Sequence, residues 1–322
     1  MTDIAAIHAA ADRMSGHVLE TPLLNSPLLD RLAGRRIFVK AECLQITGSF
    51  KARGGWSAVS ALKPEARKRG VIAYSSGNHA QGVAYAAAAH ASPCVILMPS
   101  DAPQVKIANT RRYGAEVVLY DRATADRDAL GASLSQGRGL TLIKPYDDPM
   151  VIAGQGTVGL ELARQAATAG IGQAEVLVCC GGGGVSSGIA LALEALAPGL
   201  QVRTAEPEGF DDMARSLTSG KRERNSKASG SICDAILTPS PGELTFPILQ
   251  RLAGPGTVIA DDQALQAVAL AFTHLRIVLE PGGAAALAAA LFTKDLPDTV
   301  IAVATGGNVD PATFQSALDR FA

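Results

Sequence analysis

A continuous apolar run leads directly into four glycines in Val176-Leu177-Val178-Cys179-Cys180-Gly181-Gly182-Gly183-Gly184. Unbroken apolar character, rather than alternation, is typical of a strand that is buried on both faces of a parallel sheet. The next segment, residues 186–196, is rich in alanine and leucine and predicts a helix. The stretch therefore predicts a buried strand, a glycine turn and a helix, which is the repeating pattern of an α/β protein.

Similar runs alternate with alanine-rich segments along most of the chain, at residues 37–39, 71–73, 94–97, 117–119, 202–204 and 300–303. This alternation predicts an α/β protein with parallel-rich twisted sheets and helices on both faces. Ligands on such sheets gather at the carboxyl ends of the strands. The least regular stretches, residues 63–70 and 145–150, predict a large domain of residues 1–69 and 148–322 and a small domain of residues 70–147.

Size and composition favour an ordinary soluble globular protein. The chain has 322 residues, is 48% hydrophobic and carries a formal net charge of -1, with its charged residues spread along the sequence. This pattern argues against a basic face for nucleic acid or for an anionic membrane. Five cysteines without a Cys-x-x-Cys pair, and no apolar run long enough to span a bilayer, predict a cytoplasmic protein with reduced thiols.

Lys51 lies at the start of a predicted helix, within Ser49-Phe50-Lys51-Ala52-Arg53-Gly54. Because a lysine amine has an ordinary pKa of about 10.4, covalent chemistry needs burial or a nearby cation to release its proton. We expect Arg53 to supply the charge and an apolar frame to supply the burial: Leu44, Ile46, Phe50 and Trp56. A lone lysine is more often solvated, so the hypothesis of a lysine that holds an aldehyde cofactor depends on further motifs.

The four glycines, Gly181 to Gly184, lie where a strand ends and a helix begins, so successive backbone amides can converge on an anion. Four glycines in a row cost more backbone entropy than a plain turn requires, which favours a phosphate cradle over a flexible turn. A dinucleotide site with Glu206 as the ribose ligand is the alternative. Against it, Ser186 or Ser187 stands where a Gly-x-Gly-x-x-Gly motif needs its third glycine.

Two further polar motifs follow predicted strands. In Ser75-Ser76-Gly77-Asn78-His79, the glycine allows a tight turn whose helix amides stay free to bind a carboxylate. Asn78 can donate a hydrogen bond to a phenolic oxygen, and Ser75 can give or take a proton on one face of a planar ligand. In Thr305-Gly306-Gly307-Asn308, the threonine hydroxyl can bond a heterocyclic nitrogen. Helix capping and a strand-end turn are the plainer interpretations.

Three acidic residues, Glu206, Asp211 and Asp212, follow the strand predicted near residue 202. Two carboxylates with a backbone carbonyl from the Phe210 region would suit a hard divalent cation such as magnesium or calcium. Acids that cap the following helix are an equally good interpretation. The histidines show no metal-ligand spacing with each other or with cysteine, so no zinc site is expected.

The motifs occur in one order that resembles the fold type II pyridoxal-phosphate enzymes, specifically the serine/threonine dehydratase and serine racemase branch. The resemblance runs from about Leu19 to the C-terminus and implies a two-domain α/β fold, pyridoxal 5'-phosphate as the cofactor and a homodimer. Two departures stand out. Thr305 replaces a serine that many relatives carry, which keeps a hydroxyl, and Gly282-Gly283 follows Glu280 where others have bulkier residues, which would reshape the substrate pocket.

The resemblance also implies roles for individual residues. Lys51 would form the internal Schiff base, and Ser75 would be the second catalytic residue. The cofactor would be held by Phe50, Lys51, Asn78, Gly181, Gly182, Gly183, Gly184, Val185, Glu280 and Thr305. The substrate would be bound by Ser76, Gly77, His79 and, as a closing contact, Arg127. A divalent cation, magnesium or calcium, would be bound by Glu206, Asp212 and the carbonyl of Phe210.

By the same likeness, the chain would be an ammonia-lyase of the threonine/serine dehydratase type, converting L-threonine or L-serine to a 2-oxo acid and ammonia by β-elimination. The Lys51 amine, freed when the substrate replaces it on the cofactor, would take the α proton. One alternative is a serine racemase, in which Ser75 returns a proton from the opposite face. Another is a 3-hydroxyaspartate dehydratase, with Arg276 or Arg127 for the second carboxylate. A nicotinamide-dependent dehydrogenase and a catalytically silent binding protein are alternatives from other classes.

Overall fold

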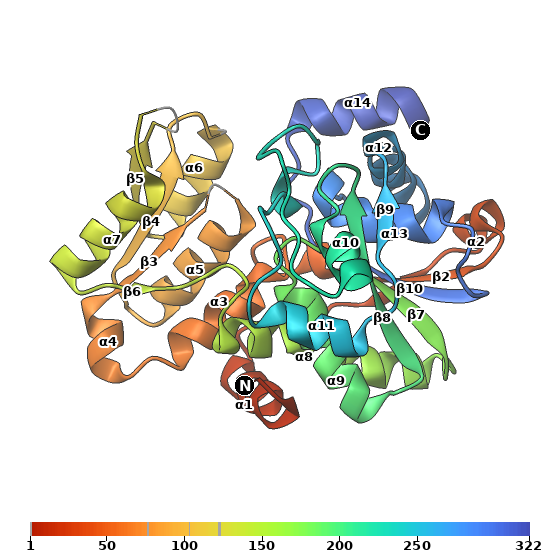
Figure 1. The fold of residues 1–322 in the computed structure, drawn as a ribbon, viewed down its shortest axis with the longest axis horizontal. Coiled ribbons are helices and arrows are strands. Elements are labelled where there is room, and N and C mark those ends of the chain that lie inside the picture. The colour runs from red at the N-terminus through yellow and green to blue at the C-terminus, as the bar shows by residue number, and fades with distance from the viewer. Residues whose placement is uncertain (1, 76, 103, 122–123) are drawn as a thin grey trace.

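The computed structural model describes residues 2–75, 77–102, 104–121 and 124–322. Within these residues the strands form two separate sheets, which Figure 1 shows on either side of α3 (Lys51–Ser60). The six-stranded sheet has the order β1 (Leu23–Asn25), β2 (Arg36–Lys40), β10 (Thr299–Val303), β7 (Ala174–Cys179), β8 (Leu200–Pro207), β9 (Thr257–Ile259). The four-stranded sheet has the order β5 (Glu116–Tyr120), β4 (Cys94–Pro99), β3 (Val71–Tyr74), β6 (Thr141–Leu142).

Neighbouring strands run parallel in both sheets, except that β1 pairs antiparallel with β2. The predicted α/β class with parallel-rich sheets is therefore confirmed. The strands of the four-stranded sheet lie between residues 71 and 142, inside the range 70–147 predicted for a small domain. The division into domains itself stays a prediction.

Helices cover both sheets (Figure 1). Around the four-stranded sheet lie α4 (Pro64–Arg69), α5 (Asn78–Ala89), α6 (Gln104–Arg112) and α7 (Arg127–Arg138). One face of the six-stranded sheet packs against α2 (Pro27–Ala33), α12 (Asp261–Leu270), α13 (Pro281–Phe292) and α14 (Pro311–Phe321), and the other against α8 (Pro149–Thr168), α9 (Gly184–Leu196) and α11 (Thr245–Leu252). The remaining α-helices are α1 (Ile4–Met14) and α10 (Asp212–Ser219), and short helical turns lie at Glu42–Leu44, Asp234–Ile236 and Ala271–Leu275. In the described ranges, no helix combines the length and apolar character needed to cross a membrane.

Alternate residues of β7 enter different hydrophobic cores. Val176 and Val178 pack with residues of α8 and α9, whereas Leu177 and Cys179 pack with residues of α12 and α13 on the other face. Successive side chains of a strand point to opposite faces, so a strand covered on both sides needs apolar residues at every position. This explains the unbroken apolar run in the sequence.

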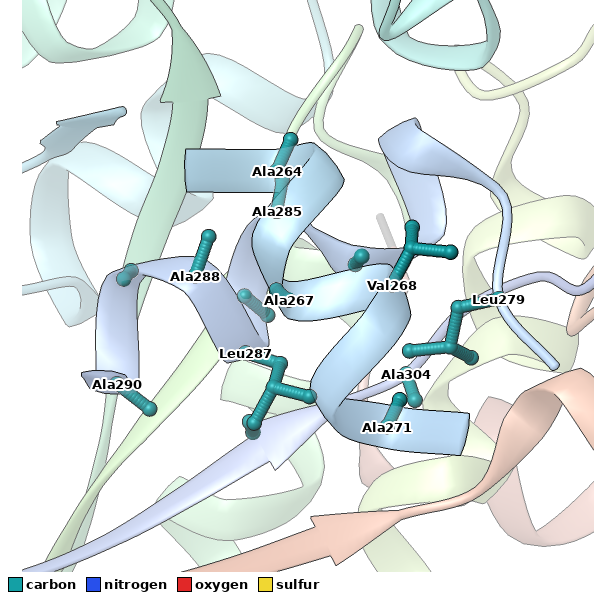
Figure 2. Packing of buried hydrophobic residues seen from close by; sticks show 14 of the residues in the cluster. Ala264, Ala267, Val268, Ala271, Leu279, Ala285, Leu287, Ala288, Ala290 and Ala304 are labelled. Atoms are coloured by element: carbon teal, nitrogen blue, oxygen red, sulfur yellow. The ribbon is translucent and has the colours of Figure 1, made fainter. Parts of the chain in front are cut away.

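The hydrophobic core between the six-stranded sheet and helices α12 and α13 contains many small side chains. Figure 2 shows Ala264 and Ala267 of α12 close to Ala285 and Ala288 of α13. Alanine side chains occupy little volume, so close packing brings the two helices near each other and near the sheet. Because α13 begins directly after Glu280, this packing also sets where Glu280 enters the site.

Candidate active site

A cavity of about 200 Å³ lies between the two sheets. Its walls include residues just beyond the carboxyl ends of β3, β7 and β10, where parallel sheets bind ligands. The predicted site residues in its lining are Phe50, Lys51, Ser75, Gly77, Asn78, His79, Gly181, Gly182, Gly183, Gly184, Val185, Glu280 and Thr305. Ser76, also predicted, lies outside the described residues. The fold thus brings the four sequence motifs to one place.

Lys51 is the first residue of α3, and its side chain lines the cavity. Its Nζ donates a hydrogen bond to the carbonyl of Pro145 at 2.7 Å. Burial lowers the pKa of Lys51 to about 8, because an ammonium group loses its hydration in the protein interior. More of the amine is therefore neutral near neutral pH than in a solvated lysine, and the neutral amine is the form that attacks a carbonyl.

Most of the apolar frame predicted from the sequence does not surround Lys51. Leu44 and Ile46 are 46% and 37% exposed, and Trp56 packs in the core beside α1. Trp56 is five residues beyond Lys51, which on an α-helix directs it about 140° away. Of the predicted frame, Phe50 lines the cavity, with its ring centroid 5.0 Å from Lys51 Nζ.

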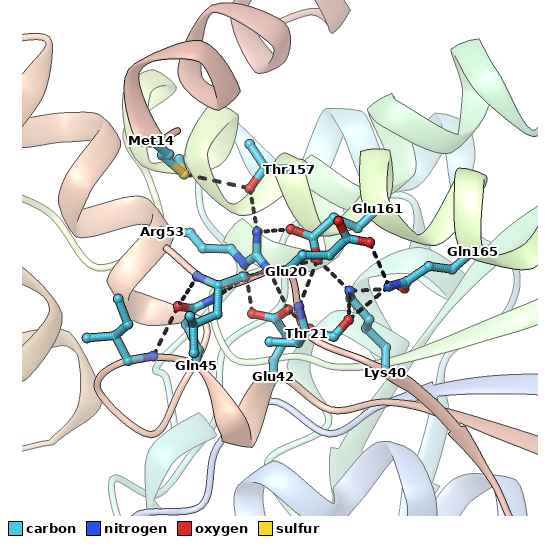
Figure 3. Close-up of polar contacts among 12 residues, drawn as sticks. Met14, Glu20, Thr21, Lys40, Glu42, Gln45, Arg53, Thr157, Glu161 and Gln165 are labelled. Carbon is cyan, nitrogen blue, oxygen red and sulfur yellow. Dashed lines mark hydrogen bonds and ion pairs between the residues drawn. The ribbon is translucent and has the colours of Figure 1, made fainter. Parts of the chain in front are cut away.

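Arg53 does not supply the charge that lowers the pKa of Lys51, so this prediction is wrong. Figure 3 shows its guanidinium in a buried network, in which it pairs with Glu42 at 2.7 Å and with Glu161 at 2.6 Å. Lys40 pairs with Glu161 at 2.5 Å in the same network. The carboxylates compensate the cations, and burial is the cause of the lowered pKa of Lys51. Arg53 instead ties α3 to α8 and to the turn after β2.

The glycine loop between β7 and α9 is closely packed. A Cβ on Gly182 would lie 2.1 Å from the ring of Tyr146, and one on Gly184 would lie 3.0 Å from Tyr146 Cα. Gly183 has φ 90°, a left-handed conformation that favours glycine. The Thr245 hydroxyl donates to the carbonyl of Gly182 at 2.6 Å. These contacts argue against a flexible turn, and the free amides at the start of α9 can bind a phosphate.

Asn78 begins α5, and two side chains orient its amide. Its Nδ2 donates to Glu280 Oε1 at 2.5 Å, and its Oδ1 accepts a hydrogen bond from Asn308 Nδ2 at 2.7 Å. Burial raises the pKa of Glu280 to about 7, although the hydrogen bond from Asn78 opposes this shift. The amide of Asn78 is thus held against the cavity wall by residues from the chain's C-terminal part.

His79 and Ser75 lie beside Asn78 in the cavity lining. His79 Nε2 donates to the carbonyl of Ile143 at 2.9 Å. Burial, together with the charge of Lys51, lowers the pKa of His79 to about 3, so the ring is neutral near pH 7 and does not act there as a general acid. Ser75 Oγ accepts a hydrogen bond from the backbone N–H of Gly77 at 3.2 Å.

Thr305 follows β10 and faces the end of β7. Its Oγ1 lies 2.9 Å from Cys179 Sγ, and both buried residues line the cavity. The nearby Gly283 packs on Gly306, where a Cβ would lie 2.2 Å from the carbonyl oxygen. The described cavity lining includes neither Gly282 nor Gly283. Gly283 therefore acts by letting α13 approach the segment after β10 rather than by widening the pocket directly, and Gly282 packs on Ala235.

The site can be compared with known proteins. A family model described as "Pyridoxal-phosphate dependent enzyme" matches residues 14–306. The chain belongs to this family. The L-threo-3-hydroxyaspartate ammonia-lyase of Pseudomonas sp is 41% identical over 96% of this chain and 96% of the relative. The serine racemase of Arabidopsis thaliana is 36% identical over 96% of this chain and 93% of the relative.

Two solved structures share the whole fold. The threonine deaminase of T.th. has a TM-score of 0.90 at 44% sequence identity and covers 96% of this chain and 99% of its own. The serine racemase of maize has a TM-score of 0.91 at 33% identity and covers 99% of this chain and 97% of its own. The predicted fold type and family are therefore confirmed.

The cavity fits the cofactor of this family. Lys51 offers an amine with a lowered pKa for an aldehyde, and the packed glycine loop at the start of α9 offers amides for a phosphate. Asn78 and Thr305 line the same cavity and carry groups that can bond a phenolic oxygen and a ring nitrogen.

The two arginines considered for substrate carboxylates lie outside the cavity lining. Arg127 begins α7, and its guanidinium lies 5.9 Å from the centroid of the Tyr74 ring, in a neighbouring pocket that shares Tyr74 and Tyr146 with the cavity. Arg276 is exposed and donates to the carbonyl of Phe272 at 3.3 Å. Arg127 stays a predicted closing contact, whereas Arg276 is not part of this cavity.

The predicted metal ligands lie near the start of α10. Both oxygens of Glu206 accept hydrogen bonds, from the backbone N–H groups of Met213 and Ala214 at 2.8 Å each, so Glu206 caps the helix. Asp212 Oδ1 accepts from Asn225 at 2.5 Å, whereas its buried Oδ2 has no hydrogen-bond partner in the described structure. Burial raises the pKa of Asp212 to about 6. Burial and the nearby Asp212 also raise the pKa of Glu206 well above its usual range. Two buried carboxyl groups with raised pKa values, one of them with an oxygen that lacks a partner, fit a cation, although no cluster of three His, Cys, Asp or Glu side chains occurs among the described residues.

Sequence reasoning missed several lining residues, notably Lys106, Tyr146, Cys179 and Asp234. The place of Cys179, two residues before the glycine loop, could have identified it. Lys106 and Asp234 form an ion pair at 3.3 Å although 128 residues separate them. No spacing in the sequence connects these two residues.

Proposed function

We propose that the chain is an ammonia-lyase that eliminates the β-hydroxyl group of a hydroxy amino acid and releases a 2-oxo acid and ammonia. The observation that carries the proposal is the Lys51 amine, whose pKa is lowered, facing a cavity that also contains the glycine loop and the start of α5. The names of the relatives support it, since they include a threonine deaminase and a 3-hydroxyaspartate ammonia-lyase. L-Threonine, L-serine and L-threo-3-hydroxyaspartate are the candidate substrates.

Residues from both sheets would hold the cofactor. Lys51 would bind its aldehyde carbon and Gly181 to Gly184 its phosphate, while Asn78 would donate to its phenolic oxygen and Thr305 would face its ring nitrogen. Phe50, Val185 and Glu280 would make the remaining contacts with the cofactor. Their position in the lining of the cavity supports this. Bound pyridoxal phosphate supplies the electron sink that stabilises negative charge at the substrate α-carbon.

The start of α5 would bind the substrate carboxylate. Amides at a helix N-terminus attract anions, and Gly77 and the neutral His79 border this position. Ser76 and Arg127 would add further contacts. The Lys51 amine, once free of the cofactor, would take the α proton as general base, and its lowered pKa leaves more of it neutral near pH 7 than in a solvated lysine.

Thr305 favours elimination over other outcomes. A hydroxyl group does not hold a ring nitrogen protonated as a carboxylate would, so less negative charge is stored in the ring. Negative charge at the α-carbon would then expel the neighbouring hydroxyl group, which would leave as water with the proton that Lys51 took from the α-carbon. The aminoacrylate released in this way hydrolyses to the 2-oxo acid and ammonia.

Absorption spectroscopy and product assays test the proposal. The protein supplied with pyridoxal phosphate should develop a visible absorption band that borohydride shifts, and Lys51→Ala should lack it. The loaded protein should release a 2-oxo acid from at least one candidate substrate. A protein that stays colourless, or one that forms no oxo acid from any of the three amino acids, is incompatible with the proposal.

Serine racemisation is the second candidate activity. Ser75 in the cavity lining and the serine racemases among the relatives favour it. Ser75 would return a proton to the face opposite Lys51. Chiral chromatography should then detect D-serine formed from L-serine, and Ser75→Ala should lose D-serine formation more than oxo acid release. Equal losses in both products would exclude Ser75 as the proton donor.

We also propose that Glu206, Asp212 and the carbonyl of Phe210 bind magnesium or calcium. The open Oδ2 of Asp212 and the raised pKa values of both carboxyl groups support this. We expect the protein to be a cytoplasmic homodimer, with residues 70–147 as the small domain of each subunit. The cysteines of the described chain are free and buried, which supports a cytoplasmic location. Light scattering tests whether the protein is a dimer.

A further inference from the structure

Lys106 lies in the wall of the cavity, yet the proposed lyase reaction gives it no task. It belongs to α6, which follows the carboxyl end of β4 in the four-stranded sheet. Its side chain is only 14% exposed. A largely buried cation in a substrate cavity has lost much of its hydration, and it gains most from a partner of opposite charge.

The partner that the structure gives Lys106 is a weak one. Asp234 Oδ2 lies 3.3 Å from Lys106 Nζ, and the Asp234 side chain is 63% exposed. Water screens the charge of such an exposed carboxylate, so pairs of this kind contribute little. Lys106 also acts on the cavity interior, because it lowers the pKa of the buried Glu280, which burial otherwise raises. The field of Lys106 therefore reaches the region where a substrate would lie.

The other basic side chains in or near the cavity are not available to bind a second anionic group. Lys51 is needed for the cofactor, and His79 is neutral because burial lowers its pKa to about 3. Arg127 lies in the neighbouring pocket over Tyr74. Among the described lining residues, Lys106 is thus the cation that remains for a second anionic group.

We propose that Lys106 is a specificity-determining residue that binds the second carboxylate of a dicarboxylic substrate, which makes a 3-hydroxyaspartate the preferred hydroxy amino acid. This inference rests on the proposed lyase function and names its substrate class. The methyl group of threonine and the hydrogen of serine offer Lys106 no charge. A substrate carboxylate inside the cavity would be less screened than Asp234, so it would replace Asp234 as the main partner of the ammonium group.

The ratio of kcat/KM for two substrates tests the role of Lys106. The loaded wild-type protein should show a kcat/KM for L-threo-3-hydroxyaspartate at least about tenfold above that for L-serine. In Lys106→Met, the ratio of these two values should fall about 10- to 100-fold, the loss expected for a hydrogen bond between charged groups. Lys106→Arg, which keeps the charge, should recover most of the ratio.

Asp234→Asn distinguishes substrate binding by Lys106 from a purely structural role of the Lys106–Asp234 ion pair. If Lys106 acts on the substrate, this variant keeps or increases the preference for 3-hydroxyaspartate, because a competing carboxylate is removed. If Lys106 acts only through its ion pair with Asp234, Asp234→Asn should have the same effect as Lys106→Met. Both variants should then lower turnover of the two substrates equally, which overturns the inference. An unchanged ratio in Lys106→Met overturns it as well.

Binding measurements give a readout that does not depend on turnover. Unreactive succinate should bind the loaded wild-type protein more tightly than butyrate, as followed by cofactor fluorescence, and Lys106→Met should remove this difference while it keeps the cofactor absorption band. A difference that persists in Lys106→Met overturns the inference. A wild-type protein that binds the cofactor but attacks no hydroxy amino acid instead refutes the lyase function, so the two failures are distinguishable.

Discussion

Cys179 Sγ lies 2.9 Å from Thr305 Oγ1 in the wall of the cavity. Burial raises the pKa of Cys179 to about 11, so the thiol stays neutral near pH 7 and can donate its proton. Sulfur is a weak acceptor, so the hydroxyl of Thr305 keeps its own proton for the cavity side. The Thr305 hydroxyl can then donate toward the cavity, where we propose that the ring nitrogen of the cofactor lies.

Removal of the thiol should weaken cofactor binding. We expect Cys179→Ala to raise the dissociation constant of pyridoxal phosphate about 2- to 10-fold, since one neutral hydrogen bond contributes about 0.5–1.5 kcal/mol. Cys179→Ser keeps a donor and should stay within about threefold of the wild type. Absorption titration of the cofactor-free protein measures both. Wild-type affinity in Cys179→Ala would show that the thiol does not orient Thr305.

Cofactor loading should depend on pH through Lys51. Only the neutral amine attacks an aldehyde, and an amine is neutral above its pKa. Because burial lowers the pKa of Lys51 from 10.5 to about 8, the rate of appearance of the visible band should rise with pH and level off above about 8. Stopped-flow absorption across this range gives the profile, with a solvated lysine peptide as control. A rise centred on the peptide's own pKa would mean that burial leaves Lys51 unaffected.

The glycine loop should not tolerate a methyl group. In Gly182→Ala, the new Cβ would lie 2.1 Å from the ring of Tyr146, and we expect a loss of about 1–3 kcal/mol in the free energy of unfolding, as in overpacked cores. The control Gly172→Ala, with no heavy atom within 4 Å of its Cβ, should change stability by less than about 0.5 kcal/mol. Urea unfolding compares the two variants. Equal stability would show that Tyr146 moves freely and that the loop is not tightly packed.

A divalent cation should stabilise the folded protein through Asp212. Calcium or magnesium at one hundred times its dissociation constant should add about 2.7 kcal/mol to the free energy of unfolding. Asp212→Asn should abolish this gain, because it removes the charge of the carboxylate whose Oδ2 has no partner in the described structure. Asp211→Asn, at the neighbouring acid that pairs with Arg215, should retain it. Thermal unfolding with and without the cation measures the effect, and no gain in the wild type would leave Glu206 as a helix cap alone.

Much of the fold could be predicted from the sequence because a buried strand requires a pattern of apolar residues that is visible over a few positions. The unbroken apolar run from Val176 to Cys179 reflects a strand that is covered on both faces. The positions of Lys51, Asn78 and Thr305 could be predicted in the same way. Each lies next to the end of a strand or at the start of a helix, and parallel sheets gather such positions at one edge.

The direction of individual side chains could not be read from the sequence. Arg53 and Trp56 are close to Lys51 along the chain, yet both point away from it into other contacts. Which way each one points depends on the helices that pack around α3, and these come from distant segments. Proximity in sequence therefore predicted the wrong source for the lowered pKa of Lys51.

By itself, the sequence determined the α/β class, the order of the motifs and the lysine that the cofactor chemistry needs, because periodicity and glycine spacing act over a few residues. Only the tertiary structure decided that Lys106 shares a cavity with Asp234 and that Cys179 meets Thr305. Both pairs join segments more than a hundred residues apart. Cys179 meets Thr305 because β7 and β10 pair in one sheet, and Lys106 meets Asp234 because the two sheets lie on either side of one cavity.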